Sequence, residues 1–210
     1  MHRAALAFLL VAASALPAPG ASYAVDPRHS ELVVKLFKAG LGSGLAHDHA
    51  VRATEFSGTV EFDPTDPSRA SITIETSAGK LVVDEPEVRR RHGLETAIKD
   101  SDRQKIQATM LGPGQLDAAR YPVIRFRSTH VEARADGTAT VTGEFTLHGS
   151  TQTVTIPVRG ALDGNEFRAR GEVRLLQSRF GIEPYSAFLG TVRVRDEFLL
   201  VVDIVATLHP

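Results

Sequence analysis

The sequence predicts an all-β fold, and three observations lead to that prediction. Polar and apolar residues alternate over short segments, which is the pattern of half-buried strands. Turn signals such as Ala135-Asp136-Gly137 and Asp163-Gly164-Asn165 separate some of these segments. Only residues 85–111 break the pattern, because they are rich in Glu, Lys, Arg and Gln and carry apolar residues at helical spacing.

The predicted strands follow one another along most of the chain. In the clearest of them, Val141, Phe145 and Leu147 share one face and threonines occupy most of the other. The last segment is long enough for one bent strand or two. Residues 85–111 are predicted to form a helical insertion that ends at Gly112-Pro113-Gly114. The alternating segments are 31–36, 56–62, 72–74, 123–131, 138–147, 153–158, 167–175 and 191–208.

Two architectures fit this alternation equally well. A closed barrel removes the unpaired edges of an antiparallel sheet, whereas a two-sheet sandwich buries the same faces in a filled core. Small residues occur at predicted inward positions, namely Gly58, Gly143, Ala169 and Gly171. They indicate either room for a ligand or bends in the wall of a barrel, and the pattern alone does not choose between them.

The first twenty residues have the features of a secretory signal peptide. Arg3 precedes the apolar run from Ala4 to Ala13, and small residues follow in Ala13-Ser14-Ala15 and Ala18-Pro19-Gly20. We therefore expect residues 1–20 to be removed on export and residues 21–210 to form one domain in the periplasm or outside the cell.

The composition excludes several classes of function. The chain has 24 Lys and Arg against 25 Asp and Glu, a balance that argues against nucleic-acid binding. It has no cysteine, which excludes thiol catalysis, thiolate metal sites and disulfides. It also lacks any stretch of about 18 or more apolar residues, so stable insertion into a membrane by a helix is not expected.

Five short motifs occur in the order found in a known family. Together they resemble the YceI-like family of lipid- and polyisoprenoid-binding domains, and the resemblance spans residues 23–205. The motifs are YAVDPRHS at 23–30, FSGTVEFDP at 56–64, YPVIRFRS at 121–128, VTGEFTLHG at 141–149 and FGI at 180–182.

The resemblance implies an eight-stranded antiparallel, lipocalin-like barrel with a helical insertion. It also implies an apolar channel that holds a polyisoprenoid, a fatty-acyl lipid or another hydrophobic small molecule, with no other cofactor and no catalytic residues. Combined with the alternation, it gives a set of residues expected to line the channel. These residues are Leu32, Val34, Leu36, Phe56, Val60, Phe62, Ile124, Phe126, Phe145, Leu147, Phe167 and Val173.

His47-Asp48-His49 is an unusual polar cluster in a region where the family usually has Gly and Phe. Two histidines at i and i+2 share one face of an extended segment. Three roles are open: hydrogen bonds that close the end of the barrel, contact with an anionic head group of a ligand, or binding of zinc, copper or haem iron. In the metal hypothesis, His29 is a candidate third ligand.

An enzyme is the less favoured class of function. Asp26, His29 and Ser30 are the residue types of a catalytic triad, but they stand too close together in sequence to be arranged freely, and no Gly-x-Ser-x-Gly elbow is present. Ser30 is therefore interpreted as a hydrogen-bonding residue near the start of a strand. A third class, a packed β-module acting in an envelope stress or redox complex, predicts no small ligand at all.

Overall fold

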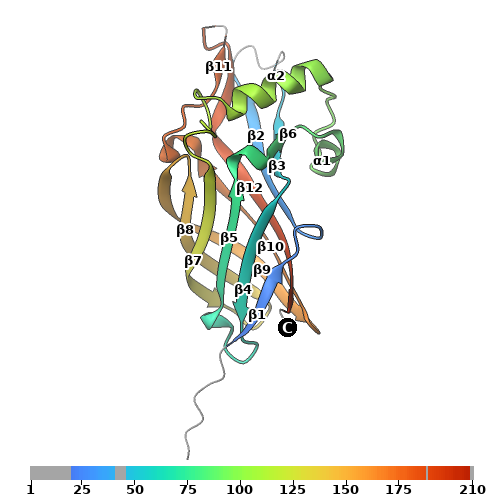
Figure 1. Cartoon of the computed structure of the whole chain (residues 1–210), viewed down its shortest axis with the longest axis vertical. Coiled ribbons are helices and arrows are strands. Elements are labelled where there is room, and N and C mark those ends of the chain that lie inside the picture. The colour runs from blue at the N-terminus through green and yellow to red at the C-terminus, as the bar shows by residue number, and fades with distance from the viewer. Residues whose placement is uncertain (1–19, 41–45, 188, 209–210) are drawn as a thin grey trace, which may run out of the picture.

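The structure, a computed structural model, describes residues 20–40, 46–187 and 189–208. Figure 1 shows a tall, narrow barrel of strands with both helices at one end. We call this end the helical end, and the opposite end, where the turn at residues 134–137 joins two strands, the hairpin end. The predicted signal peptide, apart from Gly20, lies outside the described residues.

Eight strands close into the barrel. Each strand is antiparallel to the next, and β12 also pairs with β1, which completes the ring. The predicted eight-stranded antiparallel barrel is therefore confirmed. In their order around the ring, the strands are β1 (Ala21–Val25), β4 (Phe56–Phe62), β5 (Ser71–Ser77), β7 (Val123–Ala133), β8 (Thr138–Leu147), β9 (Ser150–Asp163), β10 (Glu166–Leu176) and β12 (Val192–Leu208).

Further strands extend the wall toward the helical end. They are β2 (Glu31–Ala39), β3 (His49–Ala53) and β6 (Leu81–Val83), while the short β11 (Ser186–Ala187) pairs with β12. The pairing order β12–β2–β3–β6 repeats the order β12–β1–β4–β5. Three positions around the barrel wall are thus each occupied by two strands placed end to end with a short break between them, namely β1 and β2, β4 and β3, and β5 and β6.

Ser30 lies in the break between β1 and β2 and bonds to the neighbouring strand β12. Its Oγ accepts a hydrogen bond from the Val205 amide at 2.8 Å and donates one to the Val205 carbonyl at 3.0 Å. These bonds replace the backbone ladder where β1 stops and β2 begins. Nearby, His29 Nδ1 lies 2.8 Å from an Asp26 oxygen on an exposed turn. The hydrogen-bonding role predicted for Ser30 is confirmed.

The predicted helical insertion is confirmed, but it consists of two helices and not of a single helix over residues 85–111. The first is α1 (Pro86–Arg91) and the second is α2 (Asp100–Leu111). Gly93 ends the first helix because its φ of 71° is left-handed, a conformation that favours glycine. Short 3-10 turns occur at Pro67–Arg69, Ala78–Lys80 and Gln177–Phe180. Within the described residues, no helix has the length and apolar character needed to cross a membrane.

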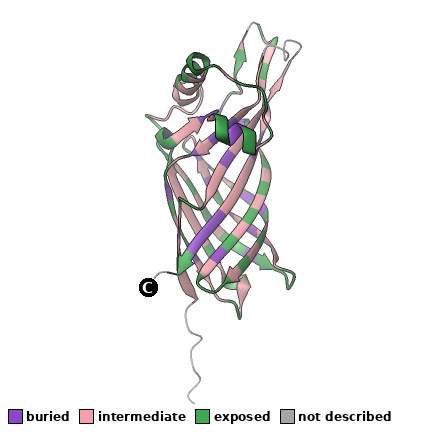
Figure 2. Ribbon diagram, turned by 90° about the vertical axis from the view of Figure 1, so that its right-hand side faces the viewer, coloured by how far each residue is buried: buried purple, intermediate pink, exposed green. Residues whose placement is uncertain are grey.

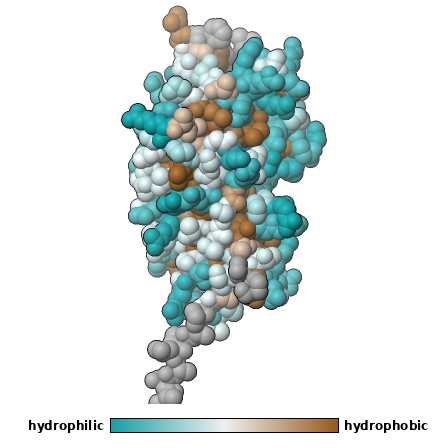
Figure 3. Space-filling view, in the orientation of Figure 1, coloured by the Kyte–Doolittle hydropathy of each residue, from teal (hydrophilic) through white to brown (hydrophobic). Residues whose placement is uncertain are grey.

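Helix α2 covers the free edge of β6. The Gln107 side chain accepts a hydrogen bond from the Val83 amide at 2.8 Å and donates one to the Leu81 carbonyl at 2.7 Å. One amide side chain therefore takes the place of a neighbouring strand, which protects an edge that would otherwise be open. Figure 3 shows hydrophobic atoms gathered below α2 on this side of the molecule.

The glycines at inward positions mark close approaches between strands. A Cβ atom at Gly58, Gly143 or Gly171 would come within 3.0 Å of a carbonyl oxygen on the neighbouring strand. Such contacts are sterically forbidden, so these positions need glycine for the tight coiling of the barrel wall. Ala169 differs, because it lines an internal cavity. The two uses of small residues that the sequence left open therefore both occur.

Two clusters of buried apolar side chains lie inside the barrel, and a third, smaller cluster joins β2, β3 and α1. The first cluster contains Val60 and Phe167, and the second contains Phe145, Phe180 and Phe198. Figure 2 shows that exposed residues alternate with intermediate or buried ones along barrel strands. Phe145 and Phe180 meet edge to face with ring centroids 5.4 Å apart. Side chains from the first and second clusters face the same cavity.

Candidate ligand-binding cavity

The barrel encloses a cavity of about 560 Å³. Its lining extends from Pro64 and Pro67 at the hairpin end to Met110 and Leu116 at the helical end. A cavity of this volume falls within the range of about 300–1,000 Å³ that is typical of small-molecule sites. The barrel therefore has room for an elongated ligand along its axis.

The wall of this cavity is almost entirely apolar. All lining residues are apolar or glycine except five, which are Thr76, Gln115, Arg134, Thr138 and Gln177. An apolar wall attracts hydrocarbon, because moving a methylene group out of water is favourable by about 0.8 kcal/mol. The surface suits a ligand with a long hydrocarbon part better than it suits a polar metabolite.

Four of the five polar side chains are already hydrogen-bonded within the protein. Their bonds are Thr76 Oγ1 to the Glu55 carbonyl at 2.6 Å, Gln115 Nε2 to the Glu183 carbonyl at 3.1 Å, Thr138 Oγ1 to Asp136 Oδ1 at 2.6 Å, and Gln177 Nε2 to the Arg195 carbonyl at 2.7 Å. The fifth is Arg134. Its guanidinium makes no hydrogen bond or ion pair with any residue in the described part of the chain.

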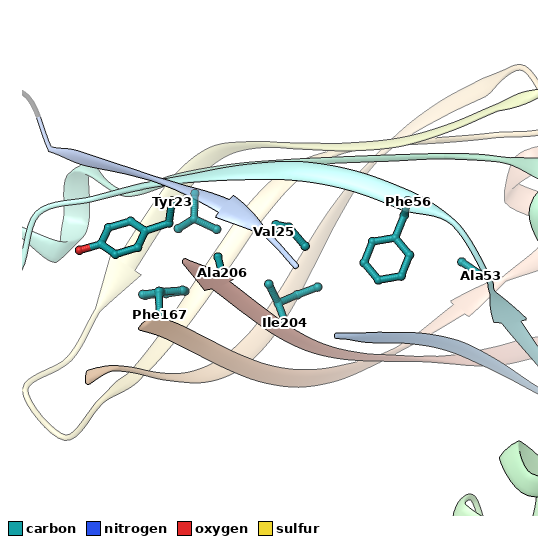
Figure 4. Close-up of a cluster of buried hydrophobic side chains, with 8 residues drawn as sticks. Tyr23, Val25, Ala53, Phe56, Phe167, Ile204 and Ala206 are labelled. Carbon is teal, nitrogen blue, oxygen red and sulfur yellow. The ribbon is translucent and has the colours of Figure 1, made fainter. Parts of the chain in front are cut away.

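Most of the predicted lining residues face the cavity. Phe56 and Val173 also point inward but lie outside the lining. Phe56 packs in the cluster shown in Figure 4, and Val173 packs against the second cluster, which contains Phe145. Alternation predicts the face of a strand and not the depth along the barrel, which explains this difference. The residues that do line the cavity are Leu32, Val34, Leu36, Val60, Phe62, Ile124, Phe126, Phe145, Leu147 and Phe167.

Sequence reasoning missed lining residues outside the long strands. Val51 and Leu81 lie on strands too short to show alternation, and Met110 belongs to α2. Arg134 lies in the turn between β7 and β8, where no periodicity applies. The apolar ones among these residues carry no local signal that separates them from ordinary core residues.

His49 belongs to a buried polar cluster behind the wall. Its Nδ1 lies 2.6 Å from Asp84 Oδ2, and the Ala50 amide donates to Asp84 Oδ1 at 3.0 Å. Arg89 from α1 donates to Asp84 Oδ1 at 2.6 Å and to the Asp48 carbonyl at 2.6 Å. Asp84 is only 1% exposed. The cluster therefore fastens α1 to β3 and β6.

The surroundings of Asp84 keep its carboxylate ionised. Burial by itself raises the pKa of this group, but the hydrogen bonds and positive charges of His49 and Arg89, together with the Ala50 amide, outweigh burial and lower the pKa below its usual value. Asp84 is thus a charged anchor for the helical insertion.

The structure does not assemble the predicted histidine site. Neither His47 nor His49 lies on the cavity lining, and Asp84 holds the Nδ1 atom of His49. Leu36 is the strand partner of His49, whereas His29 precedes Glu31 at the other end of the same strand. The strand spans about 17 Å from Glu31 to Leu36, so His29 and His49 are too far apart to bind one metal ion. No group of three or more potential metal ligands occurs in the described residues. The geometry gives no support to a metal site or to a head-group role for these histidines.

Comparison with known proteins identifies the family. Residues 23–206 match the family described as the YceI-like domain. The chain belongs to the YceI-like family. Its YceI-like relatives include proteins named UPF0312 from Pseudomonas savastanoi pv. phaseolicola, which is 31% identical over 73% of this chain and 69% of its own length, and from Vibrio parahaemolyticus, which is 27% identical over 79% of this chain and 78% of its own length.

Solved structures of other proteins have the same fold. BcnA from Burkholderia cenocepacia superposes with a TM-score of 0.66 at 22% identity, over 87% of this chain and 99% of BcnA. A YceI protein from Campylobacter jejuni gives a TM-score of 0.57 at 14% identity, over 76% of this chain and 85% of that protein. At these identities the comparison establishes the fold alone.

Proposed function

We propose that this YceI-like protein is an exported carrier that holds a polyisoprenoid or a similar amphiphilic lipid inside its barrel. The apolar cavity of about 560 Å³ is the observation that carries the proposal. A polyisoprenoid has too much hydrocarbon surface to travel through water alone, and an enclosed apolar interior removes that surface from solvent. Membership of a family of lipid-binding domains supports the same role.

The proposal needs no catalytic step. Ser30, the one nucleophile of the triad hypothesis, is occupied by the backbone of β12, and His29 is exposed on a turn. A packed module without a ligand is disfavoured by the size of the cavity, since well-packed interiors contain few voids larger than a water molecule. A binding role accounts for more of the structure than either alternative.

Export and ligand content are tested on one sample. The full chain is expressed in a bacterial host, and the protein recovered from the periplasm is examined by native mass spectrometry and by lipid extraction. We expect the polypeptide mass of a chain cleaved near residue 20, with an isoprenoid or fatty-acyl molecule bound. Retention of the uncleaved chain in the cytoplasm contradicts export. An apo mass that stays unchanged after incubation with farnesol, farnesyl phosphate, palmitate and 1-hexadecanol contradicts the carrier function.

A further inference from the structure

The cavity has one charged lining residue, and that residue lies at the hairpin end. Arg134 lines the cavity from the turn between β7 and β8, together with the small residues Ala133, Ala135 and Gly137. Pro64 and Pro67 from the connection between β4 and β5 line the same end. Arg134 is exposed in this turn and lies at the open rim of the cavity, its neighbours in the lining are short, and the rest of the lining carries no formal charge.

The turn that carries Arg134 is held rigidly. The Arg134 amide donates to the Thr138 carbonyl at 2.8 Å, and the Gly137 amide donates to the Arg134 carbonyl at 3.2 Å. Neighbouring β9 is bonded to the same turn, because the Gly160 amide donates to the Gly137 carbonyl at 2.9 Å. The backbone of Arg134 is thereby fixed at the end of the cavity, while its side chain keeps all its donors available.

Nearby carboxylates do not neutralise Arg134. Asp136 accepts hydrogen bonds from the Thr138 amide and hydroxyl, at 3.0 and 2.6 Å, and Asp63 and Asp66 are bonded to Thr65 and Ser68. None of the three acids lines the cavity or forms an ion pair with Arg134 in the described residues. All three lie where water and salt weaken their repulsion of an anion.

We propose that the ligand is an anionic amphiphile whose carboxylate or phosphate head lies at the hairpin end against Arg134, with its hydrocarbon tail in the barrel. Guanidinium groups bind both kinds of head through paired N–H donors. The other polar lining groups already donate hydrogen bonds to protein acceptors, so they have few donors left for an anion. This inference rests on the proposed function and adds the class and the orientation of the ligand.

The test compares anionic and neutral probes that share one tail. Delipidated protein is titrated with palmitate or 1-hexadecanol, and with farnesyl phosphate or farnesol, by displacement of the neutral dye N-phenyl-1-naphthylamine. For the native chain we expect each anion to bind about tenfold more tightly than its alcohol, since a partly solvated charged hydrogen bond contributes about that factor. The probe pair with the larger ratio of anion affinity to alcohol affinity identifies the preferred ligand as a fatty acid or a prenyl phosphate.

Two variants and a control define the role of Arg134. Arg134→Gln is expected to reduce the anion-to-alcohol ratio to about one, and Arg134→Lys to restore part of it. Arg159→Gln is the matched control. It removes the same charge at the same end, but Arg159 bonds to the Asp136 carbonyl and does not line the cavity, so this variant should keep the native ratio.

The possible results separate this inference from the carrier function. Equal binding of anions and alcohols by the native chain overturns the anionic class, while the carrier function stands. An unchanged ratio in Arg134→Gln, or an equal loss in Arg159→Gln, overturns the assignment of the head group to Arg134. Failure of all four probes to bind the native chain contradicts the carrier function itself.

Discussion

Replacement of Asp84 by alanine is expected to lower the free energy of unfolding by about 3–5 kcal/mol. The substitution leaves Arg89, which is 4% exposed, buried without its carboxylate. It also removes the acceptor of the Ala50 amide and the partner of His49. Asp84 has a φ of 56°, and alanine tolerates this left-handed conformation less well than aspartate. Urea denaturation of native and variant chains measures the change.

The control for this prediction is an acid on the surface. Asp203 pairs with Arg170 at 2.9 Å on the outside of the barrel, where an ion pair contributes at most about 1 kcal/mol. Asp203→Ala should therefore shift the urea midpoint far less than Asp84→Ala. Equal shifts for the two variants would show that the buried cluster contributes no more than a surface pair. Asp84→Asn, which suits the left-handed backbone, isolates the loss of charge.

The effect of Asp84 depends on pH with a definite sign. Because the folded protein holds the pKa of this carboxylate below its unfolded value of about 3.9, ionisation stabilises the fold above that pH. As the pH falls through the lowered folded pKa, the contribution is lost. The stability difference between the native chain and Asp84→Asn should therefore shrink as the pH falls below about 4.

Filling the cavity is expected to abolish ligand binding without unfolding the barrel. Leu200 faces the cavity from the middle of β12, paired with Val34 and Val173 on its neighbouring strands. In Leu200→Trp the larger ring occupies ligand space. If it displaces about four methylene groups of the tail, the loss of about 3 kcal/mol weakens binding at least about a hundredfold. Titration with farnesol measures the effect.

A tryptophan on the outer face is the matched control. Thr153 is exposed on β9, so Thr153→Trp adds the same ring outside the barrel and should leave farnesol affinity unchanged. The native chain has no tryptophan, so the fluorescence of each variant also reports the polarity around its new ring. Native affinity in Leu200→Trp, with its tryptophan shielded from water, would place the ligand somewhere other than this cavity.

The long strands were predictable because each has one face in the interior and one in water. Segment 138–147 shows this alternation throughout and is β8 without a change of bounds. The short strands β1, β3 and β6 were not among the alternating segments, because three to five residues are too few for a period of two to emerge. Gly93 was the local signal for two helices, and its effect became evident only from its left-handed backbone.

The site was predictable on its apolar side and much less so on its polar side. Inward residues such as Phe126 and Leu147 follow from alternation once the barrel is known. The histidine cluster drew attention because of its residue types, but Asp84 comes 35 positions after His49 and only the fold brings them together. Arg134 was overlooked for the same reason, since the chemical importance of a turn residue depends on which cavity it adjoins.

The central claim, that a lipid lies inside the barrel, is tested most directly by photo-crosslinking. Native protein is irradiated with a farnesol analogue that carries a diazirine in its tail, and the labelled residues are located by mass spectrometry of the digested chain. A lipid inside the barrel should label lining residues such as Phe126, Leu147 and Leu200, and excess farnesol should suppress this labelling. Labels confined to outward positions such as Thr153, or labelling that farnesol does not suppress, would contradict it.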